Sequence, residues 1–87
     1  GLKVQGDSMI NVGINDGDIV VVEVSSTANN GDIVVATIHE EFTVKTLGKK
    51  KGKPALLPAN DSYPVIRPKG SLKILGVVIG LVRKYGK

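Results

Sequence analysis

The sequence predicts a small all-β domain. Runs of β-branched residues dominate its 87 residues, and no stretch of ten or more has the 3.6-residue apolar period of an amphipathic helix. Clusters of Asn, Asp and Gly separate these runs and supply turn chemistry. With 41% hydrophobic and 23% charged residues, the composition is that of an ordinary globular chain with one small core. We therefore expect a single domain.

The expected strands are each bounded by turn residues or prolines. They span Leu2 to Gln5, Asp18 to Val24, Asp32 to Ile38, Phe42 to Leu47, Ala55 to Leu57 and Leu72 to about Val82. Turns with Asp16-Gly17 and with Asn30-Gly31 precede the second and third strands, respectively, because Asn and Gly tolerate positive φ. His39-Glu40-Glu41 is short enough to join the third and fourth strands as a hairpin.

Two strands are expected to be central. Ile19 to Val22 and Ile33 to Ala36 are apolar at every position, which is typical of strands covered on both faces. Ile74 to Val82 is the longest apolar run, but it is well short of the roughly 20 residues of a membrane span and contains two glycines. We expect Ile74 to Val82 to be a core strand.

The segment from Pro58 to Pro68 is predicted to be an irregular loop.

Charge and aromatic content argue against direct binding of nucleic acid by this chain. Much of the net charge of +4 is clustered in Lys49 to Lys53 and Arg83 to Lys87, and such runs are usually solvated loops and ends. Phe42, Tyr63 and Tyr85 are the only aromatic residues, too few for a stacking platform.

Several classes of catalytic site are disfavoured. The absence of cysteine leaves Ser, Thr and Lys for covalent chemistry. Asp7, Asp16 and Asp18 miss the spacing of a calcium loop and are interpreted as turn residues, so no metal or other cofactor is expected. His39 is the only imidazole and lies in a predicted hairpin loop, which disfavours a Ser-His-Asp triad. No Walker loop or Ser-x-x-Lys motif occurs.

Ser8 and Lys45 each have a structural and a catalytic interpretation. Ser8 either caps a short helical turn or acts as a nucleophile beside unpaired backbone amides. Lys45 shares a strand face with Thr43 and Leu47 and is either solvated or buried. Burial would lower the lysine pKa and make the amine a base for Ser8. The residue pattern alone favours the structural interpretation for both.

Three motifs that occur in one order change this balance. They are Gly6-Asp7-Ser8-Met9 followed by Gly13-Ile14-Asn15-Asp16-Gly17-Asp18, then Asn30-Gly31-Asp32-Ile33-Val34-Val35-Ala36, and then Thr43-Val44-Lys45. Two further stretches fit the same pattern, Leu57-Pro58-Ala59-Asn60 and Leu75-Gly76-Val77-Val78-Ile79-Gly80. With these motifs, the chain from Leu2 to Tyr85 resembles the catalytic C-terminal domain of the LexA repressor family. This family comprises self-cleaving serine-lysine peptidases and includes UmuD and phage repressors, and its fold consists of small, highly bent β-sheets similar to those of signal peptidases.

The resemblance implies a role for each candidate residue. Ser8 would attack a peptide carbonyl, and Lys45 would accept its proton and later protonate the leaving amine. The backbone amides of Ser8 and Met9 would hold the oxyanion, and Thr43 would orient the lysine amine. Residues 1–87 would form one catalytic and dimerisation domain.

The resemblance also implies partners. The family members dimerise, here through Leu75 to Val82, and cut their own Ala-Gly-type bond upstream of the serine when a RecA filament is present. Cutting releases the separate N-terminal domain that binds operator DNA, and so induces the cytoplasmic SOS response to DNA damage. The 87 residues contain no Ala-Gly pair, so we expect a fragment without its cleavage segment, unable to cut itself. Two alternatives remain: a UmuD-like accessory of a translesion polymerase, and a non-catalytic dimerisation module.

Overall fold

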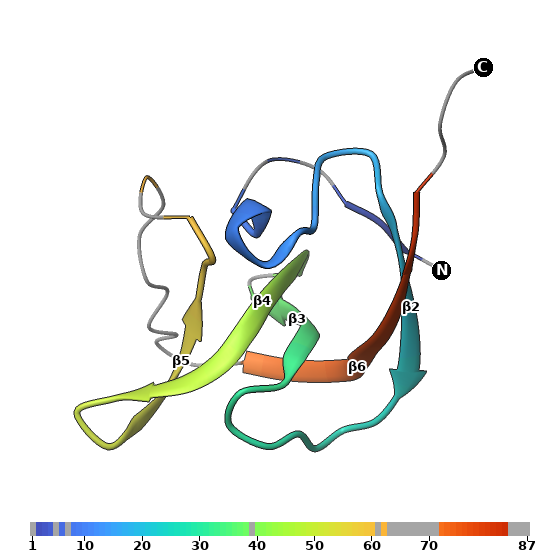
Figure 1. The fold of residues 1–87 in the computed structure, drawn as a ribbon. Coiled ribbons are helices and arrows are strands. Elements are labelled where there is room, and N and C mark those ends of the chain that lie inside the picture. The colour runs from blue at the N-terminus through green and yellow to red at the C-terminus, as the bar shows by residue number, and fades with distance from the viewer. Residues whose placement is uncertain are drawn as a thin grey trace.

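The computed structural model describes residues 2–4, 6, 8–38, 40–60, 62 and 72–83. Within this part of the chain the fold is all-β, as predicted, and its six strands form one antiparallel sheet of order β1-β2-β6-β3-β4-β5 (Figure 1). A single turn of 3₁₀ helix, η1 (Ile10–Val12), precedes the second strand. The strands are β1 (Leu2–Lys3), β2 (Ile19–Val24), β3 (Ile33–Ile38), β4 (Glu41–Lys50), β5 (Lys53–Leu57) and β6 (Leu72–Val82).

The long strand β6 joins the two halves of the sheet. Its first half pairs with β3 and its second half pairs with β2. The register shifts between Val21 and Val22 in one ladder and between Val35 and Ala36 in the other. Such bulges bend a strand and increase its twist, so β6 curves from β3 round to β2 (Figure 1). The predicted small, bent β fold is therefore confirmed.

The core has one hydrophobic cluster on each face of β3. Val35 points into a cluster with Met9, Val20 and Val44, while its neighbour Val34 points into the other. The other members of the second cluster are Ala36, Leu47 and Leu56. β3 is thus a central strand covered on both faces, as its continuous apolar sequence predicted.

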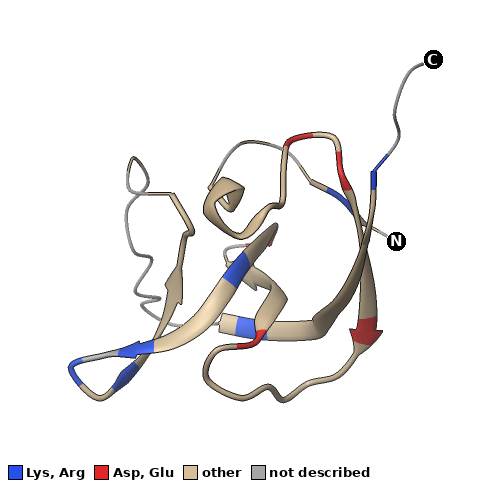
Figure 2. Ribbon diagram, in the orientation of Figure 1, with Lys and Arg blue, Asp and Glu red and all other residues tan. Residues whose placement is uncertain are grey.

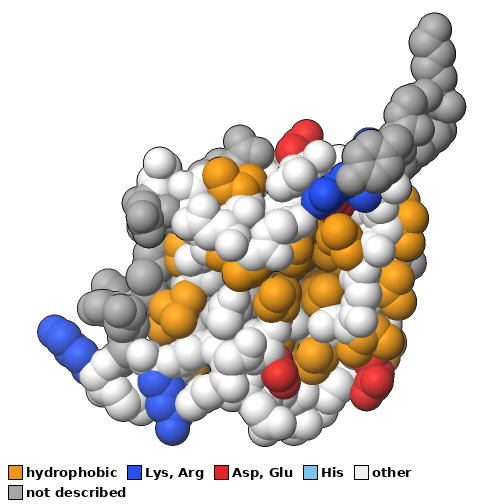
Figure 3. All heavy atoms as spheres, in the orientation of Figure 1, with side chains coloured by type: hydrophobic (Ala, Val, Ile, Leu, Met, Phe, Trp, Pro, Cys, Tyr) orange, Lys and Arg blue, Asp and Glu red, His pale blue; other side chains and the backbone are white. Residues whose placement is uncertain are grey.

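The same prediction is wrong for β2. Its pattern of burial alternates at the start, with Val20 fully buried while Ile19 and Val21 are about two-fifths exposed and Val24 is 90% exposed. β2 lies between the two-residue strand β1 and β6, near the edge of the sheet, and nothing in the described chain covers its outer face. Figure 3 shows hydrophobic side chains at the surface on this side of the molecule.

The lysine-rich segment is a hairpin rather than the loop predicted. β4 continues to Lys50 and β5 begins at Lys53, and these two residues pair with each other. The turn residues Lys51 and Gly52 have φ of 55° and 76°, the positive values that a tight two-residue hairpin turn requires. Lysines gather at the tip of this hairpin (Figure 2). The predicted hairpin between β3 and β4 is confirmed, with Glu41 already paired as a strand residue.

Several predicted features lie outside the described residues. These include Gln5 at the end of the first strand, Asp7, His39, most of the Pro58 to Pro68 excursion and the basic end after Arg83. No helix in the described residues is long and apolar enough to cross a bilayer.

Two glycines of β6 give a test of the packing between β6 and β2. A methyl group added at Gly76 would lie 2.6 Å from the Glu23 carbonyl oxygen and would collide with Val22, whereas one at Gly80 would make ordinary contact with Val21. Gly76→Ala should lower the free energy of unfolding by about 1–3 kcal/mol through overpacking. Gly80→Ala should change it by less than about 0.5 kcal/mol or raise it slightly. Urea denaturation measures both, and equal effects would contradict the packing described.

Candidate active site

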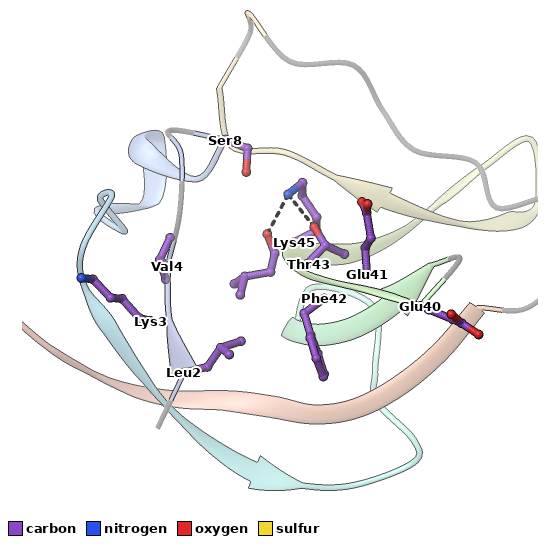
Figure 4. Close-up of a pocket in the computed structure, with 10 residues that line it drawn as sticks. Leu2, Lys3, Val4, Ser8, Glu40, Glu41, Phe42, Thr43 and Lys45 are labelled. Atoms are coloured by element: carbon purple, nitrogen blue, oxygen red, sulfur yellow. Dashed lines mark hydrogen bonds between the residues drawn. The ribbon is translucent and has the colours of Figure 1, made fainter.

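A cavity of about 530 Å³ lies between the N-terminal segment and the first half of β4 (Figure 4). One wall consists of Leu2 to Val4 and the turn residue Ser8, and the other consists of Glu40 to Lys45. The structure therefore brings Ser8 and Lys45, which are far apart in the sequence, to one cavity. Ser8 comes from the turn before η1, and Figure 4 shows its hydroxyl directed into the cavity toward the Lys45 amine.

The structural interpretation of Ser8 is not supported by the geometry of η1. The residue at the N-cap position is Met9, and no side chain caps the helix. The turn is held by the buried Met9 side chain, which is 1% exposed, and by the Met9 carbonyl, which accepts hydrogen bonds from Val12 N (3.2 Å) and Ile14 N (3.2 Å). The Ser8 hydroxyl therefore does not cap η1, and it faces the cavity (Figure 4).

Ser8 and its neighbour Met9 also present backbone N–H donors. Among the described residues, no acceptor pairs with the amide of Ser8 or of Met9, whereas the amide of Asn11 donates to the Ala59 carbonyl at 2.7 Å. Amides at the start of a helical turn have no partner within the helix. The amides of Ser8 and Met9 are therefore available to an external oxygen.

Lys45 is held by its own strand. Its side chain is half-buried, and Nζ donates hydrogen bonds to Thr43 Oγ1 at 2.8 Å and to the Val44 carbonyl at 3.1 Å. Thr43 precedes Lys45 by two residues, so strand alternation puts both side chains on one face. The hydrogen bond from Lys45 to Thr43 is the contact that the sequence analysis expected.

Burial lowers the pKa of Lys45 below its ordinary value, because the charged ammonium loses solvation. The two acceptors match the two N–H bonds of a neutral amine. A neutral amine held in this way keeps its lone pair free, whereas an ammonium has three donors to satisfy.

One edge of β4 is free beside the cavity. β5 pairs only with Thr46 to Lys50, so the described residues supply no strand partner for Glu41 to Lys45 on that edge. Free backbone groups on a strand edge are a template for an added extended segment. Sequence reasoning missed this edge and the wall formed by Leu2 to Val4. Side chains alternate between the two faces of a strand, so counting back from Lys45 through Thr43 would have placed Glu41 on the cavity face.

Asp18 also differs from its interpretation as a turn residue. Its side chain is 4% exposed and forms a two-point ion pair with Arg83, which the sequence analysis assigned to a solvated end. The hydrogen bonds from Arg83 and from the backbone of Asn15 lower the pKa of Asp18 from 3.8 to about 2. No cluster of His, Asp or Glu suited to a metal ion occurs in the described part of the chain.

The fold and the cavity agree with a class of peptidases. The chain belongs to the Peptidase S24-like family, whose model matches residues 1–79. This confirms, at the level of the family, the resemblance found in the motifs.

The similar proteins are LexA repressors. The chain is 59% identical over 83 residues to the LexA repressor of Acetivibrio thermocellus, covering 95% of this chain and 39% of that protein. It is 53% identical to that of Alcanivorax borkumensis over 83 residues, covering 94% of this chain and 41% of that protein. It is 48% identical over 84 residues to the LexA repressor of Leptospira interrogans, covering 97% of this chain and 41% of that protein. The chain thus spans about two-fifths of the length of these relatives.

The desolvation of Lys45 predicts a pH-dependent stability difference. Because its pKa is lowered in the folded state, the unfolded chain binds the proton more tightly. The stability of the unmutated chain (the parent) therefore falls as the pH decreases from about 10, the ordinary lysine value, toward the lowered pKa of the folded state. Lys45→Met removes this loss, so its melting temperature should rise relative to the parent over that range. The exposed Lys49 on the same strand is the control, and Lys49→Met should follow the parent. Parallel profiles for Lys45→Met and the parent would show that Lys45 is solvated.

Proposed function

We propose that this chain is the serine-lysine peptidase domain of a LexA-type repressor, with Ser8 as nucleophile and Lys45 as general base. The observation that carries the proposal is the Lys45 amine, half-buried and with its pKa lowered by burial, in the wall of the same cavity as Ser8. Membership of the Peptidase S24-like family supports it. The similarity to repressors favours a repressor over a polymerase accessory.

The first half of the reaction forms an acyl-enzyme. Ser8 Oγ attacks the carbonyl carbon of the scissile peptide while its proton passes to the neutral Nζ of Lys45. The carbonyl oxygen takes the negative charge and accepts hydrogen bonds from the amides of Ser8 and Met9. When the tetrahedral intermediate collapses, the C–N bond breaks and the Lys45 ammonium gives its proton to the leaving nitrogen.

The second half regenerates the site. A water molecule attacks the acyl carbon, and the neutral Lys45 amine accepts one of its protons. The C–O bond to Ser8 then breaks, the proton returns to Oγ, and a new carboxyl end is released. Thr43 and the Val44 carbonyl keep the amine aimed at Ser8 during both steps, since each accepts one of its N–H bonds.

The substrate in this proposal is an extended peptide that adds to the free edge of β4. The unpaired edge from Glu41 to Lys45 can form backbone hydrogen bonds with such a segment and leave the scissile carbonyl near Ser8. In the intact protein the segment is the chain's own Ala-Gly-type bond upstream of Ser8, and a RecA filament favours its entry into the cavity. Release of the operator-binding domain then ends repression in the cytoplasm.

The same proposal includes a homodimer formed through β6. The exposed apolar side chains of β6 include Ile79, which is 62% exposed, and Val82, and β2 adds Ile19 and Val21 beside them. An exposed apolar surface of this kind is typical of an interaction site.

Cleavage of a supplied peptide tests the catalytic assignment. The chain is incubated with a peptide that carries an Ala-Gly cleavage segment, from about pH 6 to about pH 10, and the products are followed by mass spectrometry. The rate should rise with pH as Lys45 loses its proton, and Ser8→Ala and Lys45→Ala should each lower it by at least about a hundredfold. A rate that is flat with pH and unchanged in both variants would favour the non-catalytic module.

Thr43 offers a finer test of the same site. Thr43→Val keeps the shape of the side chain but removes the acceptor for Lys45 Nζ, so turnover should fall by about tenfold or more. Thr43→Ser restores a hydroxyl and should recover most of the parent rate. Equal rates for the Val and Ser variants would contradict an orienting role.

Sedimentation velocity tests the dimer. The chain should sediment as a dimer, and Ile79→Lys should shift it to a monomer because a charge would be buried in the apolar contact. Phe42→Lys is the matched control, since Phe42 is an exposed apolar residue on β4, a strand that does not pair with β6. A parent chain that remains monomeric at high concentration, or a control that dissociates equally, would exclude this interface.

A further inference from the structure

We propose that Arg83 is a positioning residue for Ser8. Together with Asp18 it forms a clamp that fastens the segment from Gly13 to Asp18 to the end of β6, and this segment adjoins the turn that carries Ser8. This inference rests on the peptidase function proposed above. Arg83 directly follows β6, and its guanidinium reaches back to the segment between η1 and β2.

The clamp has three charge-assisted contacts. Arg83 Nε donates to Asp18 Oδ1 at 2.9 Å, and Nη2 donates to Asp18 Oδ2 at 2.7 Å and to the Gly13 carbonyl at 2.7 Å. Asp18 Oδ2 also accepts the amide of Asn15 at 2.7 Å. A planar guanidinium can make these contacts together, whereas the single ammonium of a lysine cannot reproduce their fork.

One route leads from the clamp to the turn that carries Ser8. Gly13, whose carbonyl Arg83 holds, closes η1 in the left-handed conformation, and its amide bonds to the Ile10 carbonyl at 3.0 Å. The next amide, of Ile14, bonds to the Met9 carbonyl at 3.2 Å. Met9 is bonded directly to Ser8 along the chain, so fixing Gly13 fixes the turn from which the Ser8 hydroxyl projects.

A second route leads from the clamp to the cavity wall beside Ser8. The Asp18 carbonyl accepts the amide of Val4 at 2.7 Å, and the Val4 carbonyl accepts the amide of Gly17 at 2.8 Å. Val4 lines the cavity. Asp18 therefore holds the N-terminal wall by its backbone while its carboxylate holds Arg83.

The Lys45 wall is supported separately. β4 is fixed by its ladder with β3, in which Val44 pairs with Val35 and Lys45 pairs with Val34. Its amine is oriented within the strand by Thr43. Loss of the clamp should therefore displace Ser8 while Lys45 keeps its burial, and this difference separates positioning from a general loosening of the fold.

The test compares Arg83→Met and Arg83→Lys with the parent in the peptide assay across the pH range. Turnover at saturating peptide should fall by about ten- to a hundredfold in Arg83→Met, the effect expected of a misplacement of about 1 Å. Arg83→Lys should fall between this variant and the parent. The pH midpoint of the rate should stay at the parent value, since Lys45 remains buried.

The control variant is Leu56→Val. Leu56 is fully buried in the second cluster, on the other face of β3, so its truncation lowers stability without touching the clamp. It should retain turnover within about twofold at a temperature where both variants are folded. Equal losses of turnover in Leu56→Val and Arg83→Met would overturn the positioning role. So would a pH midpoint of the rate in Arg83→Met that shifts toward the pKa of an ordinary, solvated lysine.

Amide hydrogen exchange provides a readout that does not need activity. In Arg83→Met the amides of Val12, Gly13 and Ile14 should lose at least about tenfold of their protection, while the ladder between β3 and β4 keeps its protection. Unchanged protection in the turn would refute the clamp even if turnover fell. A parent chain that cleaves no peptide would refute the proposed function, and the exchange result would still decide whether Arg83 holds the turn.

Discussion

The structure depends on the pairing of one long strand with two neighbours. β6 hydrogen-bonds to β3 along its first half and to β2 along its second half, and it is the strand that joins these two parts of the sheet. Ser8 belongs to the part built from β1, η1 and β2, whereas Lys45 belongs to the part built from β3, β4 and β5. The relative position of the two side chains is therefore a property of β6 and of the contacts at its ends. The bulges bend β6, and this bend allows the Ser8 part and the Lys45 part of the sheet to face the same cavity.

Burial of the Lys45 amine opposes folding and supports the chemistry proposed for it. An amine that keeps its proton loses solvation free energy in the cavity wall, which destabilises the folded chain at neutral pH. The same loss makes the uncharged, nucleophile-activating form accessible at a lower pH. Thr43 Oγ1 and the Val44 carbonyl offset part of the cost through hydrogen bonds, and both belong to the strand that carries the lysine. The catalytic role proposed for Lys45 would therefore come with a loss of stability at neutral pH.

The sequence predicted those features that depend on local pattern. Strand positions, the turns before β2 and β3, and the shared face of Thr43 and Lys45 follow from periodicity and from Asn and Gly chemistry. The exposure of β2 could not be predicted, because an apolar run does not reveal whether its strand lies beside the edge of the sheet. The pairing of Asp18 with Arg83 joins residues at opposite ends of the chain, so no local pattern indicates it. The motifs indicated Ser8 and Lys45 as candidates through the family resemblance, while the shape of the cavity could be seen only in the tertiary structure.

The contrast between the two supports explains why the serine and the lysine come from different kinds of structure. A strand fixes the direction of Lys45 and supplies a hydroxyl acceptor two residues away, which suits the proposed role of this lysine as a base that is partly desolvated and held in one orientation. A turn before a short helix leaves successive backbone amides unpaired, which suits the nucleophile proposed there, because its tetrahedral intermediate would carry a negative charge. The strand is rigid through its ladder with β3, but the turn has no ladder of its own. Precise alignment of the pair therefore requires additional contacts on the serine side, and these contacts are the buried Met9 side chain and the hydrogen bonds around Gly13 and Asp18.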